Sequence, residues 1–107
     1  MKVFNDNDFE NLKKEPLVAI QFSASWCSPC QALKPVLERL SNSDEYKEKI
    51  SFFYADVENE AINVASSSGI RGVPTTILYS FGNEIERVVG FPGEAKIKEV
   101  LNKCLNL

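Results

Sequence analysis

The sequence predicts an α/β protein with one mixed β-sheet covered by helices on both faces. Short apolar runs typical of buried strands alternate along the chain with segments whose apolar residues follow helical spacing. This alternation indicates parallel crossover connections, and the last two strand-like runs are close enough to form an antiparallel hairpin. The chain has 107 residues, 44% hydrophobic and 25% charged, so we expect a single globular domain over 1–107.

The N-terminal part of the chain contains two predicted strands separated by a short helix. The first strand is expected at 3–4, and several N-cap candidates follow at 5–8. The helix ends before Pro16, because proline interrupts helical hydrogen bonding. Residues 17–22 form an almost continuous apolar run, the pattern of a strand buried on both faces of a sheet.

The longest predicted helix covers 27–42. Pro29 suits its first turn, where the missing N–H is not needed, whereas Pro35 lies inside the helix and is expected to kink it. The apolar residues follow the spacing i, i+3, i+4 and i+7 and form one buried stripe: Leu33, Val36, Leu37 and Leu40.

The C-terminal half continues the alternation of strands and helices. A buried strand is predicted at 50–55 and a short helix at 58–67. Two β-rich runs, 75–79 and 85–89, flank a loop with a glycine where a positive φ is needed, which predicts a hairpin. The last helix, 93–105, ends the chain and has one apolar stripe.

The composition excludes several classes of function. Without histidine, Ser-His-Asp and Cys-His catalysis and any imidazole metal site are ruled out. Three cysteines are too few for a four-thiolate metal site, and their odd number does not suit a secreted domain that is crosslinked by disulfides. The net charge of -3 argues against nucleic-acid binding, and the apolar runs are too short to span a membrane. Because the N-terminus turns polar early, we expect a cytoplasmic protein, and we also expect a monomer.

Cys27 and Cys30 lie where the predicted strand 17–22 gives way to the long helix 27–42. The thiolate is the reactive form of cysteine, and the free N–H groups at a helix N-terminus stabilise it. Cys27, at the outer end, is therefore expected to have a lowered pKa and to attack first. Cys30, one turn further into the helix, is expected to be more buried and to resolve the mixed disulfide.

Two other interpretations of the pair are structural cysteines and half of a metal site. The metal site lacks ligands, because Cys104 is the only other cysteine and there is no histidine. The position between strand and helix favours redox chemistry over structural cysteines. Cys104 itself lies on the apolar stripe of the last helix, so we interpret it as a core residue.

Two segments of the sequence resemble motifs of the thioredoxin family. Residues 22–30, FSASWCSPC, are similar to that family's active-site segment, whose usual core is W-C-G-P-C. Residues 69–75, GIRGVPT, are similar to its G-I-R-G-I-P-T, whose proline is cis and faces the disulfide. Pro35, Gly82 and Gly90 also stand at family positions, so the resemblance extends over essentially the whole chain.

The resemblance implies the thioredoxin fold, a five-stranded mixed β-sheet flanked by four α-helices. It also implies a thiol-disulfide oxidoreductase that reduces protein disulfides by cycling Cys27 and Cys30 between dithiol and disulfide, without another cofactor. Such a protein is an electron carrier in cell redox homeostasis. Its partners would be disulfide-containing client proteins and a flavin- and NADPH-dependent thioredoxin reductase.

The same resemblance places a substrate-binding surface around the cysteine pair. A cis Pro74 would present the backbone of Val73 to an extended client segment, although by itself Pro74 suits a plain turn. Trp26 is interpreted as a partly exposed contact surface, with a core aromatic as the alternative. At Gly90 a partner's backbone would approach closely, and Phe91 would add apolar surface. The residues expected to contact substrate are Trp26, Ser28, Pro29, Val73, Pro74, Gly90 and Phe91.

Four positions depart from the family pattern. Ser28 replaces the usual glycine between the cysteines, and Ser23 stands where bacterial members often have a second tryptophan. Gln21 occupies the place of a buried aspartate that serves acid-base chemistry at the resolving cysteine, and Tyr54 that of a nearby lysine. Losing both charges together avoids an unpaired buried charge, so we expect Gln21 and Tyr54 to tune the chemistry. Alternatively, Gln21 is only a tolerated polar residue.

Two other functions stay open beside a general reductase. Ser28 and Gln21 are compatible with a specialised thioredoxin-like protein that serves a single client. A redox-silent binding subunit of a larger complex is the alternative from a different class. A glutaredoxin is disfavoured because its usual C-P-Y-C is absent, and a periplasmic oxidant because that type carries histidine between its cysteines.

Overall fold

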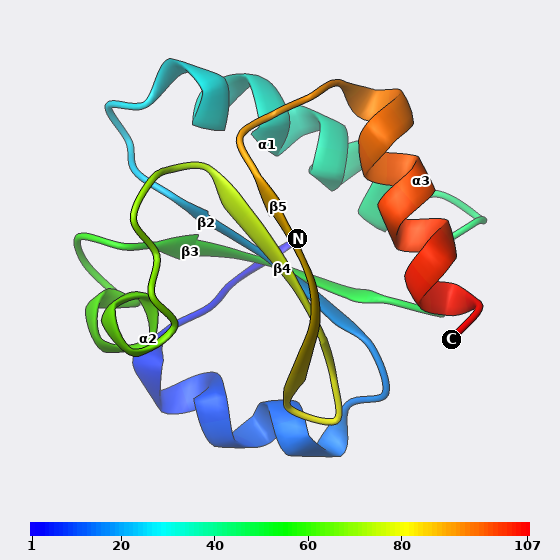
Figure 1. Ribbon diagram of the computed structural model, residues 1–107, viewed down its shortest axis with the longest axis horizontal. Coiled ribbons are helices and arrows are strands. Elements are labelled where there is room, and N and C mark those ends of the chain that lie inside the picture. The colour runs from blue at the N-terminus through cyan, green and yellow to red at the C-terminus, as the bar shows by residue number, and fades with distance from the viewer.

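The central sheet has five strands in the order β1-β3-β2-β4-β5 in the computed structural model, which describes residues 1–107 (Figure 1). β3 runs parallel to both β1 and β2, whereas β4 is antiparallel to β2 and β5 is antiparallel to β4. The predicted five-stranded mixed sheet is confirmed. The strands are β1 (Lys2–Val3), β2 (Val18–Ser23), β3 (Ser51–Asp56), β4 (Thr75–Ser80) and β5 (Asn83–Val89).

The connection from β3 to β4 corrects one expectation, because it is not a parallel crossover. It contains α2 (Ile62–Ser67), a helix of six residues. Such a helix is about 9 Å long, which is less than half the ~20 Å of a six-residue strand. The chain therefore enters β4 at the end of the sheet where it left β3. As a result, the loop before β4 and the loop after β2 lie at the same end of the sheet.

Helices cover both faces of the sheet (Figure 1). α1 (Ser28–Ser41) and α3 (Glu94–Leu105) lie on one face, and α2 lies with η1 (Asp6–Lys14) on the other. The fold thus has the four expected helices, but η1 is a 3₁₀-helix and not an α-helix. Its asparagine and aspartate residues are poor α-helix formers, and Leu12 is its only fully buried side chain.

α2 begins at Ile62 and not at the predicted position 58, because Asp56 holds the preceding segment in a turn. Its side chain accepts hydrogen bonds from the Glu58 amide and from the Asn59 side chain, both at 2.8 Å. Its backbone carbonyl accepts from the Ala61 amide at 3.0 Å. Aspartate side chains commonly compete with helical hydrogen bonds in this way.

The β4–β5 hairpin has a tighter turn than the predicted loop. Only Phe81 and Gly82 separate the strands, and both have positive φ angles, 48° and 85°. Two positive φ angles match the twist of a two-residue hairpin, and glycine adopts them without steric cost. The predicted role of the glycine is confirmed.

Two apolar cores lie on opposite faces of β2, whose six residues are all buried. Ala19 faces the core formed with α1 and α3, and Val18, Ile20 and Phe22 face the core formed with η1 and α2. The strand is therefore buried on both faces, as its apolar run predicts. A third, small cluster at the end of β2 contains Ala24, Cys27 and Cys30.

Candidate active site

Cys27 and Cys30 form a disulfide at the N-terminal end of α1, with their Cα atoms 5.2 Å apart. The loop before β4 reaches this disulfide because both loops lie at the same end of the sheet. The Val73 carbonyl oxygen lies 3.5 Å from Sγ of Cys27, and the Val73–Pro74 peptide bond is cis, as expected. Pro74 is buried, whereas Val73 is half-buried.

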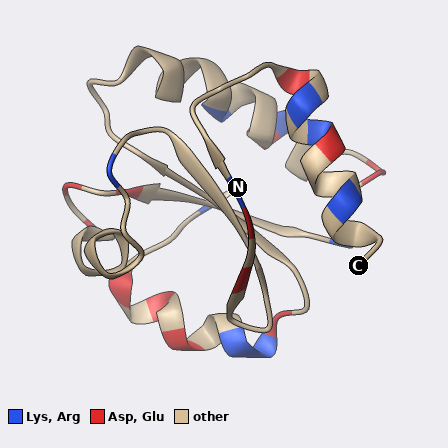
Figure 2. Cartoon of the chain, in the orientation of Figure 1, with Lys and Arg blue, Asp and Glu red and all other residues tan.

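The start of α1 provides the electrostatic environment expected for a reactive thiol. Cys27 is the N-cap residue, and its Sγ accepts a hydrogen bond from the Cys30 amide at 3.2 Å. No charged residue occurs between Gln21 and Leu33, so the first turn of α1 and the loop before it are tan in Figure 2. Within this segment no carboxylate opposes the N–H groups and the positive helix end, which favours the thiolate of Cys27.

Both cysteines are buried, with 4% of Cys27 and none of Cys30 exposed. Cys27 is therefore the more exposed residue of the pair, as its expected role as the attacking thiol requires. The exposed residues Ser28 and Pro29 lie between them in the first turn of α1. These two side chains are accessible beside Cys27, and their contact with a partner stays a prediction.

Trp26 is an exposed surface residue and not part of the core. Its side chain is 68% exposed, and its indole Nε1 donates a hydrogen bond to Oε1 of Glu58 at 2.8 Å. The expected exposure is confirmed, and the role of Trp26 in contacting clients stays a prediction. Glu58 is a site residue that our sequence analysis missed. Its position just after a predicted strand was the available signal, because the carboxyl ends of parallel strands meet at one edge.

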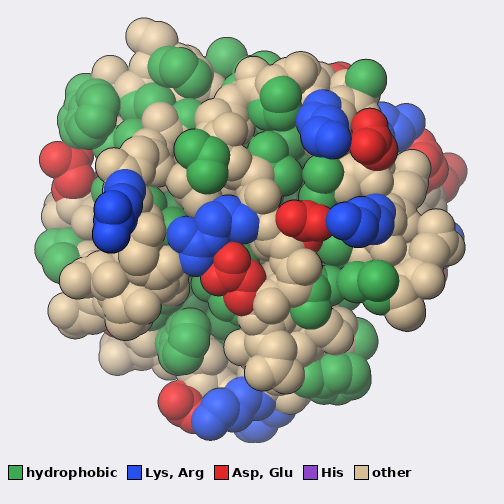
Figure 3. Space-filling model, in the orientation of Figure 1, with side chains coloured by type: hydrophobic (Ala, Val, Ile, Leu, Met, Phe, Trp, Pro, Cys, Tyr) green, Lys and Arg blue, Asp and Glu red, His purple; other side chains and the backbone are tan.

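A groove of about 510 Å³ runs beside Trp26. Ile62 of α2 and the segment 70–73 line its other side, and Ile62 is half exposed. Hydrophobic side chains gather at this end of the molecule, over the β2–α1 loop at the upper left of Figure 3. The groove therefore offers apolar surface to a client segment close to Cys27.

Gln21 lies beneath the disulfide and is fully buried. Its side-chain Nε2 donates to the carbonyl oxygen of Cys30 at 3.1 Å and to Oγ of Ser23 at 2.7 Å. Its Oε1 has no hydrogen-bond partner. Gln21 is thus adjacent to the resolving cysteine, as expected. The role of Ser23 as its partner was missed, although alternation along β2 places both side chains on one face.

Tyr54 is the register partner of Gln21 in the neighbouring strand β3. The ammonium group of Lys34, on α1, lies 4.4 Å from the centre of the Tyr54 ring. A cation from α1 therefore occupies the neighbourhood where the family has a lysine on the sheet. The tuning role expected for Tyr54 stays a prediction.

Gly90 and Phe91 follow β5 beside Pro74. Gly90 has a φ of 83°, and its amide donates to the Pro74 carbonyl at 2.7 Å. No atom lies within 4 Å of where a Cβ at Gly90 would stand, so the surface here is open to a partner's backbone. Phe91 is half-buried and packs against the core beneath α1 and α3. It therefore adds less surface to the site than expected.

Cys104 is a free, buried thiol of α3, 6% exposed, in the core shared with α1. Burial raises its pKa, and the negative charge of Glu86 raises this pKa further. Its interpretation as a core residue is confirmed.

No helix has the length and apolar character needed to cross a membrane. No group of three or more histidine, cysteine, aspartate or glutamate side chains is arranged to hold a metal ion.

Known proteins are similar to this chain in sequence and in fold. The Thioredoxin family model covers residues 1–103. A "Thioredoxin M-type, chloroplastic" of Chlamydomonas reinhardtii is 35% identical over 95% of this chain and 72% of its own length. The thioredoxin of Staphylococcus epidermidis is 33% identical, over 94% of this chain and 93% of its own. An N21Q mutant thioredoxin from Halobacterium salinarum superposes with a TM-score of 0.84 at 31% identity, covering 100% and 91% of the two chains.

The sheet, the cysteine pair at a helix N-terminus and the adjacent cis-proline loop define a thiol-disulfide oxidoreductase acting on protein disulfides. The chain belongs to the thioredoxin family.

Proposed function

We propose that this protein is a general reductant of protein disulfides, recharged by a flavin- and NADPH-dependent thioredoxin reductase. The observation that carries the proposal is the position of Cys27, whose sulfur caps α1 in a turn without charged residues. A thiolate stabilised there is a good nucleophile at neutral pH and is poised to attack a client disulfide.

The reaction proceeds by two thiol-disulfide exchanges. The Cys27 thiolate attacks one sulfur of the client disulfide, which breaks that S–S bond and releases the other client sulfur as a thiolate. Cys30 then loses its proton and attacks Sγ of Cys27, which releases the second client thiol and forms the Cys27–Cys30 disulfide. Two electrons pass from the dithiol to the client, and the reductase returns two electrons to the protein.

Client binding uses the surface on both sides of Cys27. An extended client segment beside Val73 gains backbone hydrogen bonds in the manner of an added strand. The groove next to Trp26 accommodates an apolar side chain of the same segment. The proposal needs no bound cofactor, because the cysteine pair carries both electrons. We further propose that the protein acts as a monomer in the cytoplasm.

Reduction of insulin disulfides, with NADPH and a generic thioredoxin reductase, tests the proposal. We expect rapid turnover, and a reduction potential of the Cys27–Cys30 pair near about −270 mV. A potential near about −120 mV would instead indicate an oxidant. No turnover would favour a redox-silent binding subunit. A Cys104→Ala variant serves as the control, because it removes a thiol without touching the pair.

A specialised reductase for a single client is the second candidate, and Gln21 favours it. The amide of Gln21 cannot accept the Cys30 proton at neutral pH as a carboxylate would. Slow reduction of insulin together with rapid reduction of one client would support this function.

A further inference from the structure

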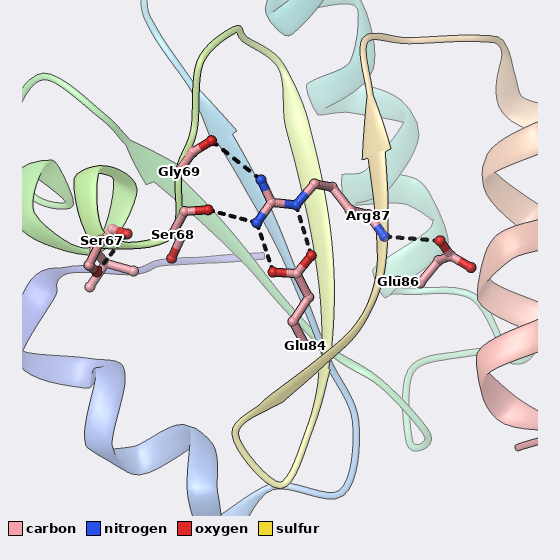
Figure 4. Close-up of polar contacts among 7 residues, drawn as sticks. Ser67, Ser68, Gly69, Glu84, Glu86 and Arg87 are labelled. Carbon is pink, nitrogen blue, oxygen red and sulfur yellow. Dashed lines mark hydrogen bonds and ion pairs between the residues drawn. The ribbon is translucent and has the colours of Figure 1, made fainter.

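Arg87, on β5, makes the densest set of polar contacts in Figure 4, although it lies outside the cysteine site. Its Nε and one terminal nitrogen donate to the two carboxylate oxygens of Glu84, at 2.8 and 2.7 Å. The same terminal nitrogen donates to the Ser68 carbonyl at 2.7 Å, and the other lies 3.5 Å from the Gly69 carbonyl. The Arg87 side chain is 29% exposed, and its hydrogen bond to the Ser68 carbonyl is partly buried.

Glu84 holds the guanidinium group in one orientation. A bidentate pair between arginine and carboxylate fixes the plane of the guanidinium and strengthens both hydrogen bonds. The hydrogen bond from Arg87 lowers the pKa of the Glu84 carboxyl, so the pair is charged at neutral pH. The remaining donors of Arg87 therefore point steadily at Ser68 and Gly69.

Ser68 and Gly69 form the end of α2, a helix that depends on outside contacts. With six residues it is too short to be stable alone, and its N-cap residue makes no side-chain hydrogen bond. Asp6 of η1 accepts from the amides of Asn63 and Val64 at its beginning. Arg87 supplies the matching contact at its end, where unpaired carbonyl groups favour a cation.

The segment that follows, 70–73, leads directly to the cysteine pair and has few internal bonds. The Ile70 amide donates to the Ala65 carbonyl at 3.0 Å, and the Thr75 hydroxyl donates to the Gly72 carbonyl at 2.7 Å. At its end, the Val73 carbonyl lies 3.5 Å from Sγ of Cys27. The segment is thus fixed mainly at its two ends, by β4 and by the Ser68–Gly69 turn to which Arg87 donates hydrogen bonds.

We propose that Arg87 is a positioning residue for protein clients: by holding the Ser68–Gly69 turn, it fixes the 70–73 segment that lines the groove opposite Trp26. The inference rests on the proposed function, since it concerns binding of a polypeptide beside Cys27. It separates two kinds of substrate. A polypeptide disulfide needs the segment, whereas a small aromatic disulfide needs only the reactive sulfur.

The test compares reduction of insulin with reduction of dithionitrobenzoate by Arg87→Gln. We expect kcat/KM for insulin to fall about tenfold, mainly through KM, while the rate with dithionitrobenzoate changes less than about twofold. Arg87→Lys keeps the charge but not the bidentate geometry and should restore only part of the loss. Lys103→Gln is the matched control. It removes a positive charge that pairs with Glu86 at 3.0 Å, and it should leave both substrates unchanged.

Amide exchange of Ile70 in the oxidised protein gives a readout independent of activity. Its exchange should be faster in Arg87→Gln than in the wild type and unchanged in Lys103→Gln. Unchanged exchange and unchanged insulin kinetics would overturn the inference, as would equal losses with both substrates. Wild-type protein that reduces dithionitrobenzoate but not insulin would contradict the proposed function instead, and the Ile70 exchange would then decide the role of Arg87 on its own.

Discussion

The two cysteine environments of this protein differ although all three thiols are buried. The exposed fractions are 4% for Cys27, none for Cys30 and 6% for Cys104. Cys27 precedes the first turn of α1, whereas Cys104 lies in the last turn of α3. Cys27 therefore lies at the positive end of its helix dipole, whereas Cys104 lies at the negative end of the dipole of a different helix.

This difference shows that burial alone does not decide which thiol is reactive. Burial disfavours a thiolate at both sites. At Cys27 the amide of Cys30 and the positive helix end offset that cost. At Cys104 burial raises the pKa and the negative charge of Glu86 raises it further, and the positive charge of Lys103 offsets only part of this rise. One residue type thus serves catalysis at one site and packing at the other.

The largest expected effect separates the two thiols of the pair. Cys27→Ser should lower insulin reduction by about 10³-fold or more, because it removes the nucleophile. Cys30→Ser should also block turnover, but it should accumulate mixed disulfides through Cys27, since no thiol remains to resolve them. Mass spectrometry of trapped clients checks this assignment. Trapping by Cys27→Ser and not by Cys30→Ser would reverse the two roles.

Gln21→Asp should make the catalytic pair differ more from the core thiol Cys104, because it adds a base beside Cys30. Resolution of the mixed disulfide should become faster near neutral pH by about 10²-fold, because a carboxylate accepts the thiol proton and an amide does not. Unfolding should become easier by about 1–3 kcal/mol, since the bond to the Cys30 carbonyl is lost and a carboxyl group is buried.

Stopped-flow disulfide reduction across roughly pH 5–9 measures the effect of Gln21→Asp. Ser23→Ala is the matched control, because it breaks the hydrogen bond from Gln21 Nε2 without adding a carboxylate. Kinetics and a pH profile equal to those of the wild type would show that Gln21 has a structural role only.

Cys104→Ala should have a smaller effect, limited to stability. Loss of a buried sulfur should cost about 1–2 kcal/mol in unfolding free energy while insulin reduction is retained. The thiol should also react slowly with alkylating reagents in the folded protein. Rapid labelling of Cys104, or disulfide-linked dimers in mild oxidant, would contradict its place in the core.

The smallest expected effect is the pH dependence that Cys104 contributes to stability. Its pKa is raised above the ordinary value of 9.0, so above that pH the unfolded chain loses this proton before the folded protein does. The unfolded state then binds fewer protons, and stability falls as pH rises from about 9 through the folded pKa. The wild type should therefore lose more stability than Cys104→Ala over this range in chemical denaturation. Parallel curves of unfolding free energy against pH for the two proteins would contradict a raised pKa of Cys104.

Local pattern was enough to predict much of the fold and the chemistry. The strands β2, β4 and β5 and the helices α1 and α3 lie within a few residues of their predicted bounds. The reason is that apolar spacing, proline and glycine act over a few neighbouring residues. The roles of Cys27 and Cys30 could also be predicted from the sequence, because their reactivity depends on a helix start that lies in the same short segment.

Contacts between distant segments were decided by the tertiary structure alone. The direction of β4 depends on how far the short helix α2 reaches along the sheet. The late start of α2 and the 3₁₀ geometry of η1 have local causes instead, in asparagine and aspartate residues that apolar spacing does not reveal. The bonds of Trp26 to Glu58 and of Arg87 to Ser68 join residues far apart in the sequence.

The Val73 carbonyl and Sγ of Cys27 illustrate the limit most directly, since 46 positions separate these residues in the chain. They meet because β4 runs antiparallel to β2, which brings the loop before one strand beside the loop after the other. A sequence determines which residues can perform thiol chemistry through local forces. The sheet topology, which follows from packing of the whole chain, determines which backbone faces the reactive sulfur.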